Sequence, residues 1–501
     1  MSIVGKEDYY IFNPGYQMRK EKKRVVIFKK NRFDNDLSNV VCFIHPLIAI
    51  LISMFDGRTE TSKIINDFSH MTSLKKTAIK KTLNKFLLNN KICFLNFDSF
   101  RSSIPDDTII PANGLTRNPV QAKEDFLIPH AELDCKSRRL DAPLDLLFEI
   151  NFNCLTNCVY CYADRSKKYQ PLPLNRILEL VREARKLGMR NFDFNGGELF
   201  LNENWECILR GLIESDYHPY ISTKVPITRK IMMKLKNIGI DSIQISLDTV
   251  IPDEMKQILN VDDQYCRDIL ACLDNLAQLG FKININSQIT RYNENSVEDL
   301  IKYLLNYHDH IKRIRIGAAG FSLYKGADSY LSFRPSLESF KKIEKTIKYY
   351  NDTAKDKIIS MSEYLTSEQM LSPLEKKTNH FKKRASCSAN FSSLVVLPDG
   401  KVTICEELYW HPQFIIGDLA VQSIEEVWNS KRALELYRFS KVEMRGESVC
   451  MNCPDSDFTS CHEVKGVCWK DILRAYGSDN WDFPDPKCPM APPPIYKYWN
   501  E

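Results

Sequence analysis

The sequence lacks an apolar stretch long enough to cross a membrane as a helix. Its longest apolar run, Phe43–Phe55, contains His45 and Pro46 and is shorter than the roughly 20 residues that such a helix needs. The first ten residues contain acids and tyrosines, whereas a secretion signal needs a basic start followed by an apolar core. We therefore expect a cytoplasmic protein without a membrane span.

The sequence also lacks a strong net charge. Its 69 basic and 64 acidic residues nearly balance, which leaves a formal net charge of +5 in 501 residues. A nucleic-acid-binding protein usually carries a marked basic excess, so no nucleic-acid partner is expected. The content of 44% hydrophobic and 27% charged residues is typical of globular domains with real cores.

Secondary-structure patterns divide the chain into five expected parts. Between residues 144 and 325, strand patterns alternate with helical patterns, and Gly188, Gly239 and Gly280 stand where three of the helices should end. Repeated β-then-α units predict an α/β fold with a parallel sheet, open or closed as a barrel, and with its chemistry at the carboxyl ends of the strands. The expected parts are a winged-helix-like unit at 1–100, a linker at 101–140, the α/β core at 141–330, a helical bridge at 331–385 and a cysteine-rich, loop-rich domain at 386–501.

Sixteen cysteines are the most informative feature of the sequence. A large chain without a secretion signal is expected to keep them reduced, as ligands of metals or clusters. Cys154, Cys158 and Cys161 are spaced C-x₃-C-x₂-C directly after the first strand of the α/β core. Three thiolates can hold three irons of a [4Fe–4S] cluster and leave the fourth iron open to a small ligand. A zinc site or simple buried thiols are the alternatives.

This loop, with the aromatic Tyr160 before its last cysteine, resembles the signature loop of radical S-adenosylmethionine (SAM) enzymes. The resemblance implies that Cys154, Cys158 and Cys161 are catalytic cluster ligands. It also implies that the amino and carboxylate groups of the methionine part of SAM chelate the free iron.

Two neighbouring motifs extend the resemblance. Asn195-Gly-Gly-Glu198 follows the second strand and resembles the Gly-Gly-Glu motif of the family, in which glycines let the backbone approach and the carboxylate takes the ammonium of SAM. The fourth strand ends in a Ser-x-Asp sequence that resembles the family's ribose and carboxylate contact. A turn or N-cap role is the alternative for any one of these residues. The cofactor-binding residues that the resemblance implies are Tyr160, Gly196, Gly197, Glu198, Ser246 and Asp248.

One position departs from the family pattern. Many members carry Asp-x-x-Arg after the fourth strand, and the Arg pairs with the methionine carboxylate, whereas this sequence has Asp253-Glu-Met-Lys256. Lysine keeps the positive charge but loses the bidentate fork of arginine. Lys256 is therefore the expected, weaker carboxylate contact.

The C-terminal part holds seven cysteines within about 100 residues, more than one tetrahedral metal needs. Their order resembles the SPASM extension of radical SAM enzymes that act on peptides. The resemblance assigns Cys387, Cys405 and Cys468 to a first auxiliary cluster, and Cys450, Cys453, Cys461 and Cys488 to a second. The first cluster would then have an open iron, unless Cys135 or His462 completes it. In total, three [4Fe–4S] clusters are expected.

The N-terminal part resembles the small winged-helix domain that binds leader peptides in ribosomal peptide maturation. The resemblance rests on His45–Gly57 and the Ile-rich helical pattern that follows. We expect a peptide to add as a strand to an exposed sheet edge near Arg24–Phe28. A generic winged helix that only packs on the barrel is the alternative.

Together these resemblances imply a radical SAM peptide maturase with a partial (β/α)₆ barrel. Such an enzyme cleaves SAM reductively to a 5′-deoxyadenosyl radical, which takes a hydrogen from a precursor peptide, with electrons from a flavodoxin- or ferredoxin-type donor. A Cys-to-α-carbon thioether, as in sactipeptide-type bacteriocins, is the expected product. The alternatives are carbon–carbon crosslinking, epimerisation, formylglycine formation, or a non-catalytic cluster-bearing protein that binds peptides.

Overall fold

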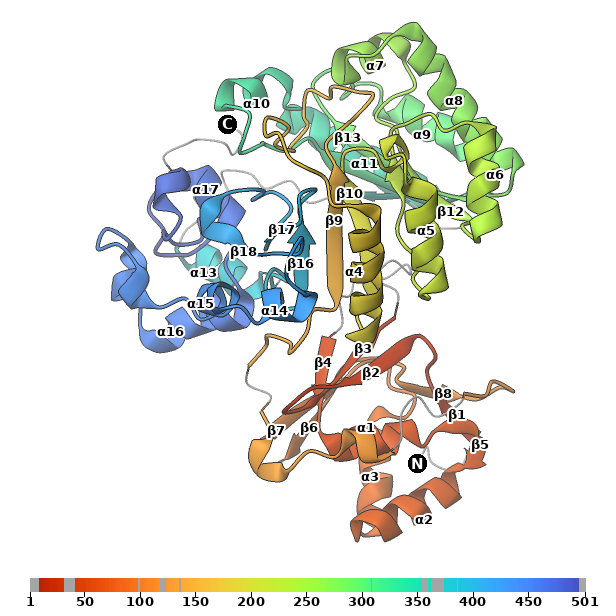
Figure 1. Ribbon diagram of the computed structural model, residues 1–501, viewed down its shortest axis with the longest axis vertical. Helices are drawn as coiled ribbons and strands as arrows, with labels where there is room; N and C mark the ends of the chain where they lie inside the picture. Colours follow the sequence, from red (N-terminus) through yellow and green to blue (C-terminus); the bar gives the residue numbers. More distant parts are fainter. Residues whose placement is uncertain are drawn as a thin grey trace. The chain divides into compact units, whose positions relative to one another are not determined.

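The computed structural model describes residues 9–30, 41–97, 100–117, 123–134, 137–307, 309–353, 359–361, 374–384 and 386–494 (Figure 1). The chain forms two compact units, Met1–Asp141 and Ala142–Glu501. No helix in the described ranges is long and apolar enough to span a bilayer.

The N-terminal unit combines short antiparallel sheets with three helices around one core. Its strands are β1 (Tyr9–Phe12), β2 (Tyr16–Lys20), β3 (Val25–Lys29), β4 (Val41–Ile44), β5 (Asp56–Glu60), β6 (Cys93–Phe97), β7 (Phe100–Ile104) and β8 (Ile109–Pro111). Its helices are α1 (Pro46–Ser53), α2 (Thr61–Thr72) and α3 (Lys76–Phe86). The sheets are β5-β1-β8, β2-β3-β4 and the β6–β7 hairpin. Ile27, Ile50, Ile64 and Phe86 lie in the shared core.

Two expectations for this unit need correction. The strand edge predicted near Arg24–Phe28 is not an edge, because β3 pairs with β2 on one side and with β4 on the other. The outer strands of that sheet, within the described residues, are β2 and β4. The predicted linker also contains structure, since β7 and β8 fall within residues 100–111. These strands were not predicted because they are short and lie in a polar, proline-containing segment without clear periodicity.

The larger unit begins with six parallel strands. They are β9 (Asp145–Asn151), β10 (Asn191–Gly196), β11 (Ser222–Thr223), β12 (Ser242–Ser246), β13 (Lys282–Ile289) and β14 (Ile311–Ala318). The predicted β/α arrangement is confirmed. Within the described residues, however, the strands divide between two sheets, with orders β10-β9-β16-β17-β18 and β11-β12-β13-β14-β15.

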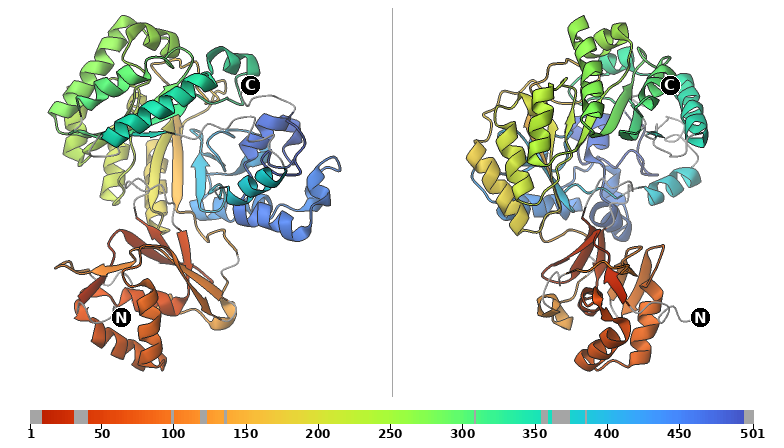
Figure 2. Two further views of the ribbon diagram at one scale, coloured as in Figure 1. Left: turned by 180° about the vertical axis from the view of Figure 1, so that it is seen from behind. Right: turned by 90° about the vertical axis from the view of Figure 1, so that its right-hand side faces the viewer.

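Helices cover the outer face of these strands (Figure 2). They are α4 (Leu174–Lys186), α5 (Trp205–Glu214), α6 (Arg229–Ile238), α7 (Pro252–Leu259), α8 (Asp263–Gln278) and α9 (Val297–Leu305). Local chemistry sets several of their ends. The Thr228 hydroxyl accepts from Ile231 N at the start of α6, and Gly239 ends that helix at φ 96°. Helix α7 is an addition to the elements that periodicity predicted.

The C-terminal part continues the first sheet. Strand β16 (Ser393–Val396) pairs in parallel with β9, and β17 (Lys401–Thr403) and β18 (Ile415–Asp418) follow it antiparallel. Strand β15 (Ile359–Met361) likewise extends the second sheet beyond β14. The remaining α-helices among the described residues are α10 (Ala327–Phe333), α11 (Leu337–Thr353), α13 (Leu374–Lys383), α14 (Ile424–Trp428), α15 (Lys431–Tyr437), α16 (Asp455–Thr459) and α17 (Trp469–Tyr476). The cysteine-rich region is thereby joined to the core by a strand pair.

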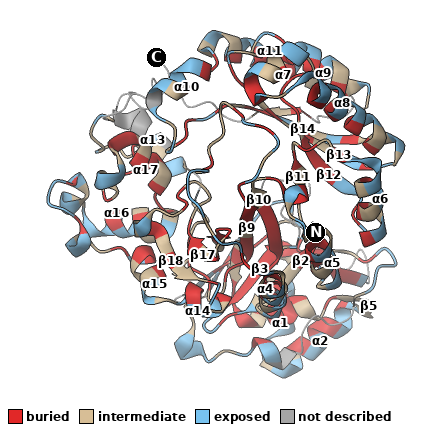
Figure 3. Cartoon of the chain, turned by 45° about the horizontal axis from the view of Figure 1, so that its top comes forward, coloured by how far each residue is buried: buried red, intermediate tan, exposed pale blue. Residues whose placement is uncertain are grey.

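The parallel strands have one apolar and one polar face. On β9, Leu146, Phe148 and Ile150 pack into the core with the helices. The alternate positions on β9 and β10, Glu149 and Asn195, therefore lie on the opposite, inner face. Both strands are largely buried (Figure 3). A polar inner face that is also buried is expected where a polar ligand is held.

Candidate active site

The first cysteine loop follows β9 and is fastened by its backbone. Asn157 N donates to Leu259 O at 2.8 Å, and Val159 N donates to Ile258 O at 2.9 Å. Both acceptors lie at the end of α7, the helix that periodicity missed. The Lys325 ammonium donates to the carbonyl of Cys158 at 3.0 Å. The loop that carries Cys154, Cys158 and Cys161 is thus held from two sides.

The three thiols of this loop influence one another. Burial raises the pKa of Cys154 to about 12, with further increases from the Glu198 carboxylate, Cys161 and Cys158. Burial also raises the pKa of Cys158, whereas the Lys224 ammonium lowers it. Because burial favours the protonated forms of Cys154 and Cys158, binding of iron must displace their protons.

The Gly-Gly-Glu turn is built against this loop so closely that a side chain would not fit. A Cβ on Gly197 would lie 2.4 Å from Asn151 Oδ1 and 2.5 Å from Asn153 O, and Gly196 has φ +95°. Glu198 N donates to Asn153 O at 2.8 Å, and Asn151 Nδ2 donates to Glu198 O at 3.0 Å. The two motifs that the sequence separates by 35 residues therefore form one structure.

Glu198 presents a buried carboxylate whose oxygens are oriented by β11. Thr223 Oγ1 donates to Glu198 Oε2 at 2.6 Å, and Lys224 N donates to Glu198 Oε1 at 2.9 Å. Burial raises the pKa of Glu198, while these hydrogen bonds and the Lys224 ammonium lower it. Each oxygen keeps a lone pair that could accept from a cationic ligand.

Asp248, at the end of β12, is the second acidic centre. Tyr160 Oη donates to Asp248 Oδ2 at 2.5 Å, the Lys224 ammonium lies 2.9 Å from the same oxygen, and Gln288 N donates to Oδ1 at 2.9 Å. Ser246 lies two residues earlier, and its hydroxyl accepts from Gln244 Nε2 at 2.7 Å. The structure therefore brings together Tyr160 and Asp248, two of the predicted cofactor-binding residues.

Lys256 is not brought into this group. Its ammonium lies on α7, 2.6 Å from Asp263 and 3.4 Å from Asp253, and about a third of its side chain is exposed. Sequence analysis did not single out Lys224, yet its side chain is 14% exposed and its ammonium lies between Asp248 and the ring of Tyr160. The Asp248 carboxylate raises the pKa of Lys224 against the effect of burial. The sequence did contain one indication that Lys224 is functional, because it directly follows Thr223 at the end of a predicted strand.

The C-terminal cysteines fall into two electrostatic groups. The charge of Cys387 raises the pKa of Cys468, and Lys470 acts on Cys387, Cys405 and Cys468 alike. In the other group, Cys488 and Cys453 act on Cys450, while Cys488 and Cys450 act on Cys461. Burial is the largest cause of the raised pKa of Cys387, Cys405, Cys450, Cys453, Cys461 and Cys468. The Asp485 carboxylate raises the pKa of Cys387, Cys461 and Cys468 alike, and the division of the seven cysteines between two clusters stays a prediction.

Neither set of cysteines forms a compact single-ion site. Within the described ranges, no three His, Cys, Asp or Glu side chains converge as on one metal ion. Separate thiolates that each hold a different iron of a cluster do not need to converge in that way.

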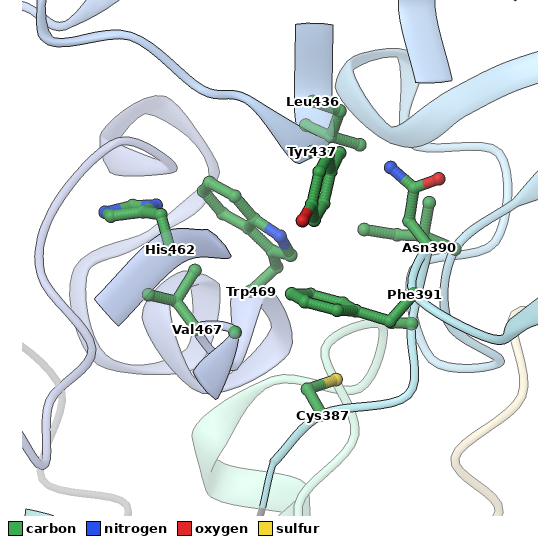
Figure 4. A pocket seen from close by; sticks show the side chains of 11 residues that line it. Cys387, Asn390, Phe391, Leu436, Tyr437, His462, Val467 and Trp469 are labelled. Carbon is green, nitrogen blue, oxygen red and sulfur yellow. The ribbon is translucent and has the colours of Figure 1, made fainter. Parts of the chain in front are cut away.

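The two suggested fourth ligands of the first auxiliary group have different outcomes. Cys135 lies outside the described residues. His462 borders the same pocket as Cys387, but its imidazole points away from that thiol (Figure 4). It stacks on Phe458 with ring centroids 4.3 Å apart, and burial lowers its pKa to about 4. His462 is therefore held as a neutral ring in an aromatic environment.

Family models match the two cysteine-bearing regions. Residues 148–304 match the model described as the radical SAM superfamily, and residues 387–454 match SPASM, described as an iron–sulfur cluster-binding domain. The first match contains Cys154, Cys158 and Cys161. The second contains Cys387, Cys405, Cys450 and Cys453, whereas Cys461, Cys468 and Cys488 follow its end.

Individual relatives are distant. The antilisterial bacteriocin subtilosin biosynthesis protein AlbA of Bacillus subtilis is 22% identical over 342 residues, which are 66% of this chain and 69% of that protein. A probable GTP 3′,8-cyclase of Pyrobaculum aerophilum is also 22% identical, over 35% of this chain, and the chain spans only 58% of its length.

One solved structure is similar over nearly the whole chain. Streptococcus suis SuiB, solved bound to the precursor peptide SuiA, aligns with a TM-score of 0.63 and 14% identity, covering 96% of this chain and 100% of that chain. At that identity the likeness concerns the fold. It includes the N-terminal unit as well as both cysteine-bearing regions.

Proposed function

We propose that this chain, which is a radical SAM protein with a C-terminal SPASM domain, is a maturase that modifies a ribosomally made precursor peptide. The observation that carries the proposal is the joined structure of the first cysteine loop and the Gly196–Glu198 turn, with Lys224 and Asp248 beside it. The fold shared with SuiB over its full length, and the relation to AlbA, support a peptide as the substrate.

The residues around the first cysteine loop fit SAM by their chemistry. Cys154, Cys158 and Cys161 would hold the [4Fe–4S] cluster, which with SAM supplies a 5′-deoxyadenosyl radical. Glu198 accepts from the ammonium of SAM, and Gly196 and Gly197 leave room for its approach. Lys224 takes the carboxylate contact first expected of Lys256. Tyr160, Ser246 and Asp248 are the remaining proposed contacts to SAM and could hydrogen-bond its ribose hydroxyls.

Two auxiliary clusters complete the proposed cofactor set of three. Cys387, Cys405 and Cys468 would hold one, and Cys450, Cys453, Cys461 and Cys488 the other. The grouping of their electrostatic interactions supports this division. With three protein thiolates, the first auxiliary cluster would keep an iron open towards the substrate.

The N-terminal unit is the proposed binding site for the leader part of the precursor peptide. An outer strand, β2 or β4, is the place where an extended peptide can add, since β3 is paired on both sides. A low-potential electron donor of the flavodoxin or ferredoxin type is the proposed second partner.

The proposed product is a thioether between a cysteine sulfur and an α-carbon. An open iron in the first auxiliary cluster could bind the substrate thiolate, and the named relative AlbA belongs to the biosynthesis of a bacteriocin. Carbon–carbon crosslinking uses the same parts and is the second candidate.

Anaerobic reconstitution followed by a peptide assay tests this function. Wild type and the Cys154/Cys158/Cys161→Ala variant are compared for iron, sulfide and 5′-deoxyadenosine formed from SAM with dithionite. The wild type is expected to hold three clusters and the variant two, with no 5′-deoxyadenosine. Short Cys-containing peptides encoded beside the gene are then added, and the wild type should remove two hydrogens from one of them. Zinc in place of iron, or no SAM cleavage by a fully reconstituted wild type, would refute the proposal.

A further inference from the structure

Glu149 is a buried carboxyl without hydrogen-bond partners. Its residue is 0% exposed, and neither Oε1 nor Oε2 has a partner among the described residues. Burying an unpartnered acid costs free energy of folding, so such a group persists in a native structure for a reason other than stability. Nothing in the packing of β9 requires an acid there, since Leu or Gln would fill the same volume.

The surroundings of Glu149 form a polar group on the inner face. Asn195, its register neighbour on β10, donates from Nδ2 to Tyr162 Oη at 2.8 Å and to Glu406 Oε2 at 2.7 Å. The hydroxyl of Tyr409 is buried and is a second orphan without a partner in the described chain. We call Glu149, Tyr162, Asn195, Glu406 and Tyr409 the inner polar group.

This group lies between two of the cluster-binding loops. Tyr162 follows Cys161 and Glu406 follows Cys405 in the sequence. Gly196 contacts Glu149 directly, because a Cβ there would lie 3.1 Å from Glu149 Cβ. The two unpartnered groups, the Glu149 carboxyl and the Tyr409 hydroxyl, therefore lie among residues that directly follow a proposed ligand of the SAM cluster and one of the first auxiliary cluster.

The proposed reaction has an unassigned proton. Joining a carbon to a sulfur or to a second carbon breaks one C–H bond and one further X–H bond. The hydrogen atom of the C–H bond goes to the 5′-deoxyadenosyl radical and gives 5′-deoxyadenosine. The X–H hydrogen leaves as a proton, and the remaining electron passes to an auxiliary iron–sulfur cluster. The proposed function names an auxiliary cluster as the acceptor of the electron, but it names no acceptor for the proton.

We propose that Glu149 accepts this proton, while the hydroxyl of Tyr409 hydrogen-bonds the same substrate residue and positions it. This inference rests on the proposed function. A substrate S–H would supply a hydrogen bond that the carboxyl lacks, and this bond favours the ionised form of the carboxyl. Burial makes the carboxylate a stronger base than it is in water, which suits a general base at neutral pH.

The groups facing Glu149 agree with such a base. Burial is the largest cause of its raised pKa, and the charge of Glu406 raises that pKa further. Tyr162, Tyr409 and Tyr324 are the other titratable groups that interact with it. Burial raises the pKa of each of these phenols, so they remain neutral when Glu149 titrates.

The test compares wild type with Glu149→Gln, which keeps the volume, in reconstituted full-length protein with SAM, dithionite and the Cys-containing peptides, in D₂O. We expect the variant to form 5′-deoxyadenosine in the presence of peptide but to crosslink at least about 100-fold more slowly, the usual contribution of a general base. The recovered peptide should carry solvent deuterium in place of the abstracted hydrogen. Crosslinking by the variant at the wild-type rate would overturn the inference.

Two further measurements separate a chemical role from a structural one. The wild-type crosslinking rate should fall at low pH as Glu149 becomes protonated, and this pH dependence should vanish from the residual rate of Glu149→Gln. If that variant fails to bind iron, Glu149→Asp decides: a slower rate with the pH dependence retained supports the inference, and a pH-independent rate refutes it. A wild type that forms 5′-deoxyadenosine but never changes a peptide would instead refute the proposed function.

Discussion

Strand β9 carries a buried carboxyl near each end, and the two carboxyls differ in their hydrogen bonding. At the amino end, Asp145 accepts from Arg190 Nε at 2.7 Å, from Arg190 Nη2 at 2.8 Å and from Asn191 Nδ2 at 2.9 Å. Four residues later, at the carboxyl end, Glu149 accepts from no described donor. Asp145 stabilises the pair of strands β9 and β10 through these hydrogen bonds. Glu149 lacks a donor among the described residues, so we expect its donor to come from a bound ligand. This is the division expected of parallel β/α folds, which do their chemistry at the carboxyl ends of the strands.

The largest effect is expected at the amino end. Asp145→Ala removes the carboxylate that accepts two hydrogen bonds from the buried Arg190 guanidinium, which should lower the free energy of unfolding by about 3–5 kcal/mol. Thermal and urea unfolding of the apoprotein measure it, with Glu149→Gln as the matched control on the same strand. A loss below about 1 kcal/mol would show that the bidentate pair is not the structural element we take it to be.

Substitutions at the carboxyl ends of the parallel strands should change the affinity for SAM more than the stability of the fold. Lys224→Met removes a charged contact and should weaken SAM binding to the reconstituted protein by about 10- to 100-fold, which corresponds to about 1.5–3 kcal/mol. Lys256→Met is the matched control, because the Lys256 ammonium is already engaged by Asp253 and Asp263 at the surface. Equilibrium dialysis against labelled SAM distinguishes them. Stronger weakening by Lys256→Met would restore the assignment made from the sequence.

The sequence predicted those parts of this arrangement that depend on local pattern. Cysteine spacing predicted the first ligand loop, the resemblance to SPASM predicted the two C-terminal ligand groups, and alternating strand and helix patterns placed the Gly-Gly-Glu and Ser-x-Asp motifs at strand ends. What it missed depends on partners far away in the chain. The pairing of β3 on both sides, and of β16 with β9, is set by tertiary contacts. Lys256 occupies the position of the arginine in the family pattern Asp-x-x-Arg, but its side chain on α7 pairs with Asp263 instead. Glu149 could have been recognised as an acid on the inner face, since it alternates with Phe148 and Ile150.

Substitution at Glu149 should change stability in the direction opposite to that at Asp145. Glu149→Leu replaces an unpartnered acid by an apolar side chain of similar size, so we expect the apoprotein to become more stable by about 1–2 kcal/mol while crosslinking is lost. The same unfolding experiment measures the gain. Destabilisation would mean that the carboxyl has a structural partner, and the contrast between the two ends of β9 would then disappear.

The pH dependence of stability should show the same contrast in the smallest steps, about 1 kcal/mol for each pH unit. Burial raises the pKa of Glu149 in the folded protein above its value in the unfolded chain. As pH rises past the ordinary glutamate value, the unfolded chain therefore loses this proton first, and unfolding releases a proton. The contribution of Glu149 is fully favourable only below that value, and it falls by about 1 kcal/mol for each pH unit until the folded pKa is passed. Wild type should accordingly lose stability relative to Glu149→Gln over the range of pH above the ordinary glutamate value. The difference in unfolding midpoints across this range measures it, and parallel curves for the two proteins would mean that Glu149 titrates as it does in water.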